Sequence, residues 1–307
     1  MIRVSAGTAH VLGLKSIQSQ TDPTTGYFLT GDVCSGACAF CPQAQGQSSN
    51  LSRIVWPEFS QSDILAALAQ QTSLKRYCFQ VADGTGWLGS TERLLRELRS
   101  AGLTTPSCVS CRPRNTADIQ RLLQAGAERV SIALDACTPE VAAKVGRDWH
   151  GTWTLLQDAS GLFPGRISTH LIIGLGETER EACQCMQELY ELGISIALFA
   201  FTPVKGTPMS ALPQPDVGRY RRLQAAHSLL RVLGAQEFRW SPRGVLQFSD
   251  EQIEALAPKT FETSGCPDCN RPYYNERPNG IMYNYPRPLS AVEFQQCLSE
   301  LEAVGDE

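Results

Sequence analysis

Three closely spaced cysteines are the residues of this chain best suited to chemistry. Cys34, Cys38 and Cys41 are separated by three and by two residues, so their thiolates can hold three irons of a [4Fe–4S] cluster. No fourth cysteine follows in the same run, so the fourth iron would stay open to a small chelating molecule. A zinc site and a chance grouping are the alternatives, and this spacing disfavours both. The run therefore predicts a cluster with an open iron.

The loop around these cysteines resembles the cluster loop of the radical S-adenosylmethionine (radical SAM) enzymes. Phe40 stands just before the last cysteine, and the apolar run Tyr27-Phe28-Leu29 precedes the loop, as in that family. The resemblance implies that Cys34, Cys38 and Cys41 are catalytic ligands and that Phe40 lies beside the cofactor. It also implies that the cluster binds S-adenosylmethionine and cleaves it to a 5′-deoxyadenosyl radical.

Composition bounds the remaining possibilities. The 307 residues are 42% hydrophobic and 19% charged, enough for one large α/β barrel or two ordinary domains. We find neither an apolar run near the ~18 residues of a membrane span nor a signal-peptide pattern at residues 1–5, so we expect a cytoplasmic protein without a membrane partner. Twelve cysteines then indicate reduced thiols and metal ligation. The net charge of −4 and the lack of a Lys/Arg block disfavour nucleic acid, although an RNA-modifying enzyme could share this average.

The elements that must position the cysteines alternate along the chain. Short β-branched runs follow amphipathic stretches, which is typical of repeated βα units. We expect six strands, at Tyr27–Thr30, Arg76–Val81, Ser107–Cys111, Arg129–Leu134, Ile167–Ile173 and Ile194–Phe201. We expect helices at Asp63–Gln70, Glu92–Ser100, Ala117–Ala125, Pro139–Lys144, Trp153–Gly161, Glu179–Leu192 and Val217–Leu233. Six such units predict an α/β fold, a partial (β/α)6 TIM-like barrel, with its chemistry at the C-terminal ends of the strands.

The alternation of βα units ends near Gly234. The stretch Cys266–Leu289 is rich in Pro, Asn, Arg and Tyr and has no helical or strand period, yet it is too apolar for a disordered tail. We therefore expect an N-terminal extension at 1–24, the barrel at 25–233, and an irregular C-terminal cap over the barrel mouth at 234–307.

Several strand ends resemble the biotin synthase branch of the radical family, over roughly residues 27–212. Asp135, which closes the fourth expected strand, resembles the acidic residue that binds the ribose hydroxyls of the cosubstrate; a helix N-cap is the alternative. Gly174, Gly176 and Glu177 match the glycine-rich turn that lets backbone approach the nucleoside. The resemblance implies that these four residues bind the cofactor.

Two further segments belong to the same comparison. Phe201–Pro208 resembles the ending of the sixth strand in that branch. Where its members show Gly-Gly-Glu for the cosubstrate amine, this chain has Val81-Ala82-Asp83-Gly84. Asp83 and nearby backbone carbonyls are therefore the candidates for that contact.

Other cysteines could hold a second cluster. Biotin synthase carries a sulfur-donating cluster deep in its barrel, and Cys78 and either Cys108 or Cys111 fall at similar places. Cys108 and Cys111 are three apart on one strand, so they face opposite sides, and we expect Cys111 to point inward. Ser168 stands where biotin synthase has a cysteine, which argues against biotin synthase itself.

Cys266 and Cys269 bracket two residues and could complete this second set as a chelate hook, with a structural zinc clip as the alternative. The implied ligands of a second, auxiliary iron–sulfur cluster are thus Cys78, Cys111, Cys266 and Cys269. The segments Cys269–Pro278 and Tyr283–Pro286 resemble a subunit of the two-protein radical lipoyl synthase, whose two enzymes insert sulfur into an octanoyl chain on a protein lysine.

The resemblance implies sulfur insertion into an unactivated C–H bond of a protein-bound octanoyl chain, in lipoyl cofactor biosynthesis. The implied partners are a lipoyl-carrier protein with an octanoyl-lysine, a second radical SAM subunit, and an electron donor such as ferredoxin or flavodoxin. Arg271, Arg277 and the pair Tyr273 and Tyr274 would shape the mouth for the acyl arm, or would simply pack the cap. Another radical SAM enzyme on a small metabolite or RNA, and a non-catalytic iron–sulfur or zinc protein, remain the alternatives.

The remaining thiols and the histidines carry weaker signals. The four histidines share no ligand spacing, and for His170 a core position is favoured over one facing the barrel interior. We expect ordinary packing roles for Cys137, Cys183, Cys185 and Cys297.

Overall fold

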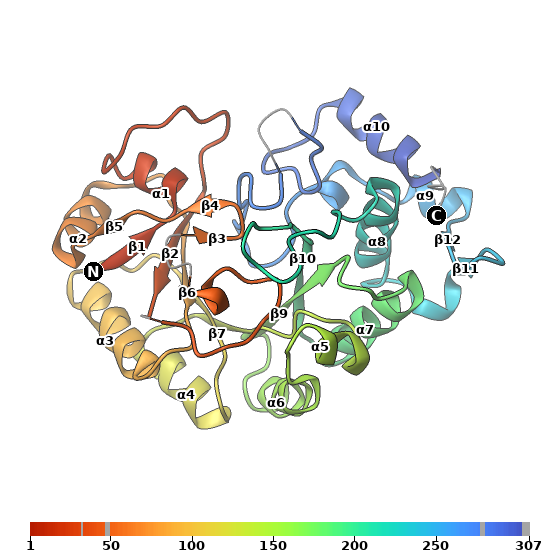
Figure 1. Cartoon of the computed structure of the whole chain (residues 1–307). Helices are drawn as coiled ribbons and strands as arrows, with labels where there is room; N and C mark the ends of the chain where they lie inside the picture. The colour runs from red at the N-terminus through yellow and green to blue at the C-terminus, as the bar shows by residue number, and fades with distance from the viewer. Residues whose placement is uncertain (32, 47–49, 277–279, 303–307) are drawn as a thin grey trace.

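One curved sheet organises the chain (Figure 1). The computed structural model describes residues 1–31, 33–46, 50–276 and 280–302. Within these ranges the sheet has eight strands in the order β10-β9-β8-β7-β6-β2-β1-β5. Its six parallel strands are β2 (Thr25–Thr30), β6 (Arg76–Val81), β7 (Ser107–Cys111), β8 (Arg129–Ile132), β9 (Ile167–Ile173) and β10 (Ser195–Ala200).

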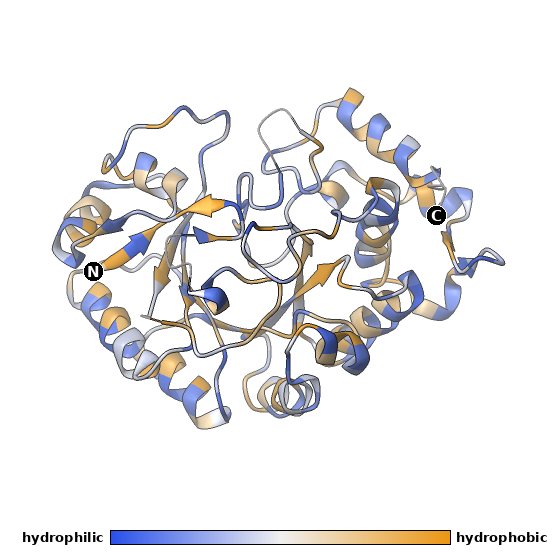
Figure 2. Ribbon diagram, in the orientation of Figure 1, coloured by the Kyte–Doolittle hydropathy of each residue, from blue (hydrophilic) through white to orange (hydrophobic). Residues whose placement is uncertain are grey.

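Helices cover the outside of this sheet (Figure 1). They are α2 (Gln61–Gln70), α3 (Trp87–Ser100), α4 (Thr116–Ala125), α5 (Pro139–Lys144), α6 (Trp149–Leu162), α7 (Glu179–Glu191) and α8 (Val217–Leu229). Figure 2 shows that several strands of the sheet are largely hydrophobic, whereas the helices carry both hydrophilic and hydrophobic residues, as expected for a buried sheet covered by amphipathic helices. The predicted partial barrel is confirmed, and each expected strand and helix appears with its ends shifted by a few residues at most.

Local chemistry explains where several helices begin. Thr178 accepts a hydrogen bond from the backbone of Glu181, whose carboxylate accepts one from the Thr178 backbone, and this capping box starts α7. Thr138 caps α5 in the same way through the Val141 N–H, with Pro139 at the first helical position. Both helices therefore start at the residues that their sequence signals predict.

The N-terminal residues expected as an extension take part in the sheet. β1 (Ile2–Val4) pairs antiparallel with β2 and with β5 (Glu58–Phe59), and α1 (Ala6–Val11) follows it. A strand of three residues is too short to show a period of two, so the sequence pattern did not reveal it. A small hairpin of β3 (Asn50–Leu51) and β4 (Ile54–Val55) follows the cysteine loop.

The C-terminal region contains more regular structure than expected. It adds the pair β11 (Arg239–Trp240) and β12 (Leu246–Gln247), the short helix α9 (Asp250–Glu254) and the longer helix α10 (Ala291–Glu302). The buried Arg221 of α8 ties this region to the barrel, because its Nε donates to Glu300 of α10 at 2.8 Å and its Nη1 to the Tyr283 carbonyl at 2.7 Å.

The irregular cap segment does not simply cover the barrel mouth, which corrects the sequence-based expectation. At the start of β6, Arg76 Nε donates to the Pro267 carbonyl at 2.8 Å, and at the start of β2 the Thr25 hydroxyl donates to the Asp268 carbonyl at 2.8 Å. Farther along, Asn275 Nδ2 donates to the carbonyl of Ala200, the last residue of β10, at 2.7 Å. The segment therefore runs inside the open barrel, from the N-terminal to the C-terminal ends of the strands. None of the helices within the described ranges has the length and apolar character needed to cross a membrane.

Candidate active site

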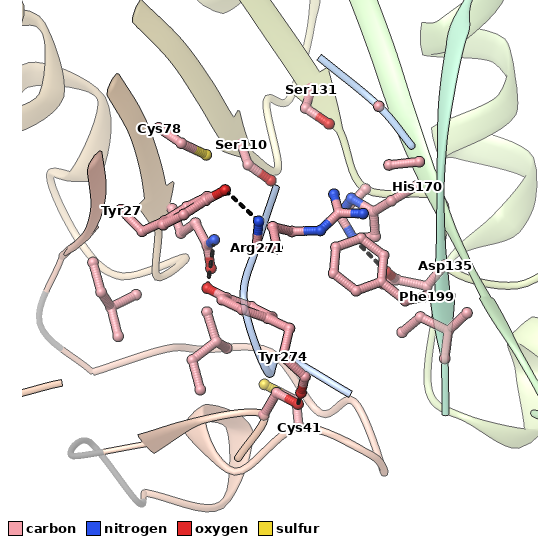
Figure 3. A pocket seen from close by; sticks show the side chains of 18 of the residues that line it. Tyr27, Cys41, Cys78, Ser110, Ser131, Asp135, His170, Phe199, Arg271 and Tyr274 are labelled. Atoms are coloured by element: carbon pink, nitrogen blue, oxygen red, sulfur yellow. Dashed lines mark hydrogen bonds and ion pairs between the residues drawn. The ribbon is translucent and has the colours of Figure 1, made fainter. Parts of the chain in front are cut away.

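A cavity of about 270 Å³ runs through the barrel interior and is lined at its two ends by two groups of thiols (Figure 3). Its walls come from alternate residues of the parallel strands, because successive side chains of a strand point to opposite faces. The strand side chains facing the cavity include Cys78, Gln80, Cys108, Ser110, Ser131, Ser168, His170, Ala197 and Phe199.

The first group of thiols follows β2. Cys34, Cys38 and Cys41 all line the cavity, and the loop that carries them is tied to the next strand because the Ser35 N–H and hydroxyl donate to the Asp83 carbonyl at 2.7 and 2.6 Å. Burial raises the pKa of Cys38 and raises that of Cys41 to about 11, so in the metal-free chain both hold their protons. Bound iron would replace those protons.

The loop packs closely around its sulfurs. A Cβ at Gly36 would lie 2.9 Å from Arg112 Nη1 and 3.3 Å from Cys34 Sγ, so a larger residue there would displace the Arg112 side chain and crowd the sulfur. Arg147 Nη1 lies 3.7 Å from Cys38 Sγ, and Phe40 lines the same end of the cavity. The Asp83 carboxylate, the candidate for the cosubstrate amine, lies 3.8 Å from Arg112 Nη1, and both residues line the cavity.

Asp135 connects this loop to the middle of the cavity. Its buried carboxylate lies 2.9 Å from Arg147 Nε and 2.7 Å from His170 Nε2, and its backbone has a positive φ of 67°. Burial would raise the pKa of Asp135, but the charges of Arg147 and then His170 outweigh this and lower it to about 2. The N-cap alternative does not apply, because Thr138 itself caps the helix that follows.

His170 is a site residue that the sequence analysis placed in the core. It lines the cavity, bonds to Asp135 and packs edge-on against Phe199, with the ring centroids 5.4 Å apart. The signal was the strand alternation, since Ser168, His170 and Ile172 occupy every second position of β9 and all three line the cavity.

The glycine-rich turn after β9 lies behind the cavity wall and is not part of it. The Glu177 carboxylate accepts the backbone N–H groups of Gly174 and Leu175 at 2.8 and 3.1 Å and pairs with Arg219 at 3.0 Å. Gly174 has a φ of 103°, and a Cβ there would lie 3.3 Å from Phe201 Cβ. Gly174, Gly176 and Glu177 are not among the residues that line the cavity, whereas Phe201, against which Gly174 packs, does line it. Their contact with the cofactor stays a prediction.

The second group of thiols gathers at the N-terminal ends of the strands. Cys108 Sγ lies 3.3 Å from Cys266 Sγ, and Cys78 is paired with Cys108 in the sheet register, so both project to the same face. Cys269 joins them from the segment that enters the barrel, and all four thiols line the cavity. In the part of the chain that the structure describes, no three His, Cys, Asp or Glu side chains converge on a single ion-sized point.

Cys108 therefore takes the place that we expected for Cys111. The alternation along β7 turns Cys108 and Ser110 into the cavity. Val109 and Cys111 belong to the apolar core, although Cys111, the last residue of the strand, also borders the cavity. Burial, followed by the charges of Asp118 and Asp83, raises the pKa of Cys111. Both cysteines border the cavity, and it is Cys108, not the expected Cys111, whose sulfur contacts Cys266 of the hook.

Arginines surround the second group of thiols. Arg76 Nη1 lies 3.2 Å from Cys108 Sγ, and Arg271 Nη1 lies 3.8 Å from Cys269 Sγ. The hydrogen bond from the Cys108 thiol, followed by the charges of Arg129 and Arg76, lowers the pKa of Cys266 below that of an ordinary thiol. Thiols in an electropositive, enclosed setting suit an anionic metal–sulfur group.

Of the residues expected to shape the mouth for the acyl arm, some line the cavity and others do not. Arg271 and Tyr274 line the cavity itself, and the Tyr274 hydroxyl accepts a hydrogen bond from Gln80 Nε2 at 2.7 Å. Tyr273 instead donates to Gln20 at 3.0 Å, away from the residues that line the cavity. Arg277 lies outside the described residues.

Residues 28–189, just over half of the 307, match the radical SAM superfamily. The chain belongs to the radical SAM superfamily. Membership implies a [4Fe–4S] cluster and S-adenosylmethionine as cofactors, and the matched region contains the three thiols of the loop after β2.

Its similarity to characterised radical SAM proteins is distant. It is 29% identical to a biotin synthase of Synechococcus sp. (strain JA-3-3Ab) over 60% of this chain and 61% of the relative. It is 24% identical to a biotin synthase of Coxiella burnetii (strain Dugway 5J108-111) over 58% of this chain and 56% of the relative. The chain thus spans about three fifths of the length of these relatives.

Solved structures share its fold. The hydrogenase maturase HydG superposes with a TM-score of 0.55 at 10% identity, over 68% of this chain and 50% of that one. A methylornithine synthase superposes with a TM-score of 0.51 at 12% identity, over 64% of this chain and 59% of that one. Both support the partial barrel and neither identifies a substrate.

Proposed function

We propose that this radical SAM enzyme inserts sulfur into an unactivated C–H bond, and that its substrate is an octanoyl chain bound to a protein lysine. The observation that carries the proposal is the single cavity with thiol groups at both ends. We assign Cys34, Cys38 and Cys41 to the cluster that binds S-adenosylmethionine. We assign Cys78, Cys108, Cys266 and Cys269 to an auxiliary, sulfur-donating cluster. The similarity to biotin synthases also supports sulfur insertion, because biotin, for which these relatives are named, contains sulfur.

The bound groups would supply the radical that removes a hydrogen from an unreactive carbon and the sulfur that replaces it. The task of the chain is to place that carbon between them and to exclude water. Tyr27, Leu29, Phe199 and Tyr274 form an apolar wall between the two thiol groups, which suits a saturated chain. The carboxylate of Asp135, held in place by Arg147 and His170, lies at the end of the cavity that we assign to the first cluster.

The proposed partners follow from this substrate. An octanoyl-lysine reaches an enclosed cavity only as an extended arm, so the carrier protein would dock outside while its arm enters. We further propose a second radical SAM subunit, because lipoyl formation needs two sulfur insertions, and an electron donor such as ferredoxin or flavodoxin.

The test is an anaerobic incubation of the reconstituted protein with S-adenosylmethionine, a reductant and an octanoyl-lysyl peptide, read by mass spectrometry. We expect 5′-deoxyadenosine together with a peptide that has gained one sulfur. The matched control is the Cys266→Ala/Cys269→Ala variant, which should still form 5′-deoxyadenosine but transfer no sulfur. Deoxyadenosine without sulfur gain by the wild type, even with candidate partner subunits added, would reject the octanoyl substrate and favour a small metabolite or RNA.

A further inference from the structure

The hydroxyl of Tyr27 lies within hydrogen-bond reach of the hook. The backbone N–H of Arg271 donates to Tyr27 Oη at 2.8 Å, and Cys269 Sγ lies 3.5 Å from the same oxygen. A phenol carries one proton, whereas a sulfur that ligates metal carries none, so with a ligating Cys269 the Tyr27 hydroxyl is the donor of this pair. Tyr27 is only 2% exposed, so water does not compete for it. The Tyr27 O–H is therefore placed to donate to the Cys269 sulfur.

The guanidinium of Arg271 approaches the same sulfur from another side. Its Nη1 lies 3.8 Å from Cys269 Sγ, its Nη2 donates to the Ser264 carbonyl at 2.9 Å, and its central carbon lies 4.0 Å from the Phe199 ring centre. Figure 3 shows this side chain crossing the cavity between Tyr27 and Phe199. Among the carboxylates in the described ranges, none forms an ion pair with Arg271. A buried cation needs a compensating anion, and a thiolate at Cys269 is the acidic group that acts most strongly on Arg271, with the buried carboxylate of Glu276 farther off.

We propose, on the basis of the auxiliary cluster assigned above, that Tyr27 and Arg271 are positioning residues that set the reduction potential of that cluster through Cys269. Hydrogen bonds and positive charge at a ligating sulfur stabilise the more negative, reduced state of an iron–sulfur cluster, so they raise its potential. Cys269 receives two such donors, whereas Cys108 faces one, from Arg76 at 3.2 Å.

A raised potential serves the proposed sulfur transfer. In the proposed transfer the substrate carbon radical would supply one electron and a sulfide of the auxiliary cluster a pair. Two of these three electrons would form the C–S bond, the sulfide would give up its bond to iron, and the third electron would reduce the cluster. Donors that favour the reduced cluster therefore favour bond formation, and Tyr27 and Arg271 act on this step without touching the reacting carbon.

The experiment uses the full chain carrying Cys34→Ala, Cys38→Ala and Cys41→Ala, so that any cluster signal belongs to the auxiliary site. After anaerobic reconstitution, iron is counted and the midpoint potential is measured by redox titration with electron paramagnetic resonance. Tyr27→Phe and Arg271→Met are compared with Tyr274→Phe. The control ring lies 6.0 Å from that of Tyr27, and its hydroxyl is bonded to Gln80 instead of a thiol.

We expect about four irons in the background variant, a more negative potential in Tyr27→Phe and Arg271→Met, and no shift in Tyr274→Phe. Loss of the cluster from Tyr27→Phe but not from Tyr274→Phe would also support the inference. Equal potentials in Tyr27→Phe, Tyr274→Phe and the background, with iron retained, would overturn this inference and leave the proposed function standing. A background variant that binds no iron would overturn both.

Discussion

The assignment of Cys108, and not Cys111, as the β7 ligand of the auxiliary cluster gives the sharpest test of the site. Cys108 contacts Cys266 at 3.3 Å and Arg76 at 3.2 Å, whereas Cys111, three residues away on the same strand, packs in the apolar core. Two cubic clusters would hold about eight irons per chain. Cys108→Ala removes one of four auxiliary ligands and should reduce the count to about four, while Cys111→Ala should keep about eight.

Stability provides the internal control for this pair. Cys108 and Cys111 are 1% and 3% exposed, so loss of either sulfur removes a similar amount of buried side chain and should cost about 1 kcal/mol in the metal-free protein. Urea unfolding of the metal-free variants should therefore give similar results, while iron and sulfide analysis after anaerobic reconstitution separates them. Iron loss in Cys111→Ala with retention in Cys108→Ala would refute the assignment of β7. A wild-type protein with about four irons and bound zinc would refute the auxiliary cluster itself.

Three further substitutions test other parts of the structure. Asp135→Asn removes the charge that pairs with Arg147 and His170 and should slow 5′-deoxyadenosine formation about 100-fold; an unchanged rate would place the nucleoside elsewhere. Burial, followed by the charge of Arg231, lowers the pKa of His227 from 6.5 to about 4, so the unfolded chain takes up a proton first as the pH falls. The wild type should therefore lose about 3 kcal/mol of stability between pH 6.5 and 4, and His227→Gln should flatten this loss in urea unfolding across that range. Gly174→Ala combines a strained φ of 103° with contacts to Pro215 Cδ at 3.1 Å and Phe201 Cβ at 3.3 Å, and should cost about 1–3 kcal/mol. The control Gly176→Ala shares the backbone strain, with a φ of 124°, but meets nothing within 4 Å, so it should cost less; the opposite order would contradict the packing role of this turn.

Much of the barrel could be predicted because its signals are local. Alternating βα patterns predicted the parallel strands, and the capping box at Thr178 and the proline after Thr138 predicted where two helices start. The same patterns could not reveal β1, whose three residues pair with strands that lie far from it in the sequence. Its existence depends on those partners and not on its own composition.

Some features of the candidate site could also be predicted from the sequence, and others only from the tertiary structure. The spacing of Cys34, Cys38 and Cys41 lies within one loop, so the sequence by itself determined that thiol group and the family to which it points. Only the tertiary structure decided that Cys108 and not Cys111 meets the hook, since that depends on which face of β7 turns inward. It also brought Cys266 and Cys108, 158 positions apart, to the same end of the barrel. Contacts between distant segments depend on how the strands curve and pack, which no local pattern of residues records.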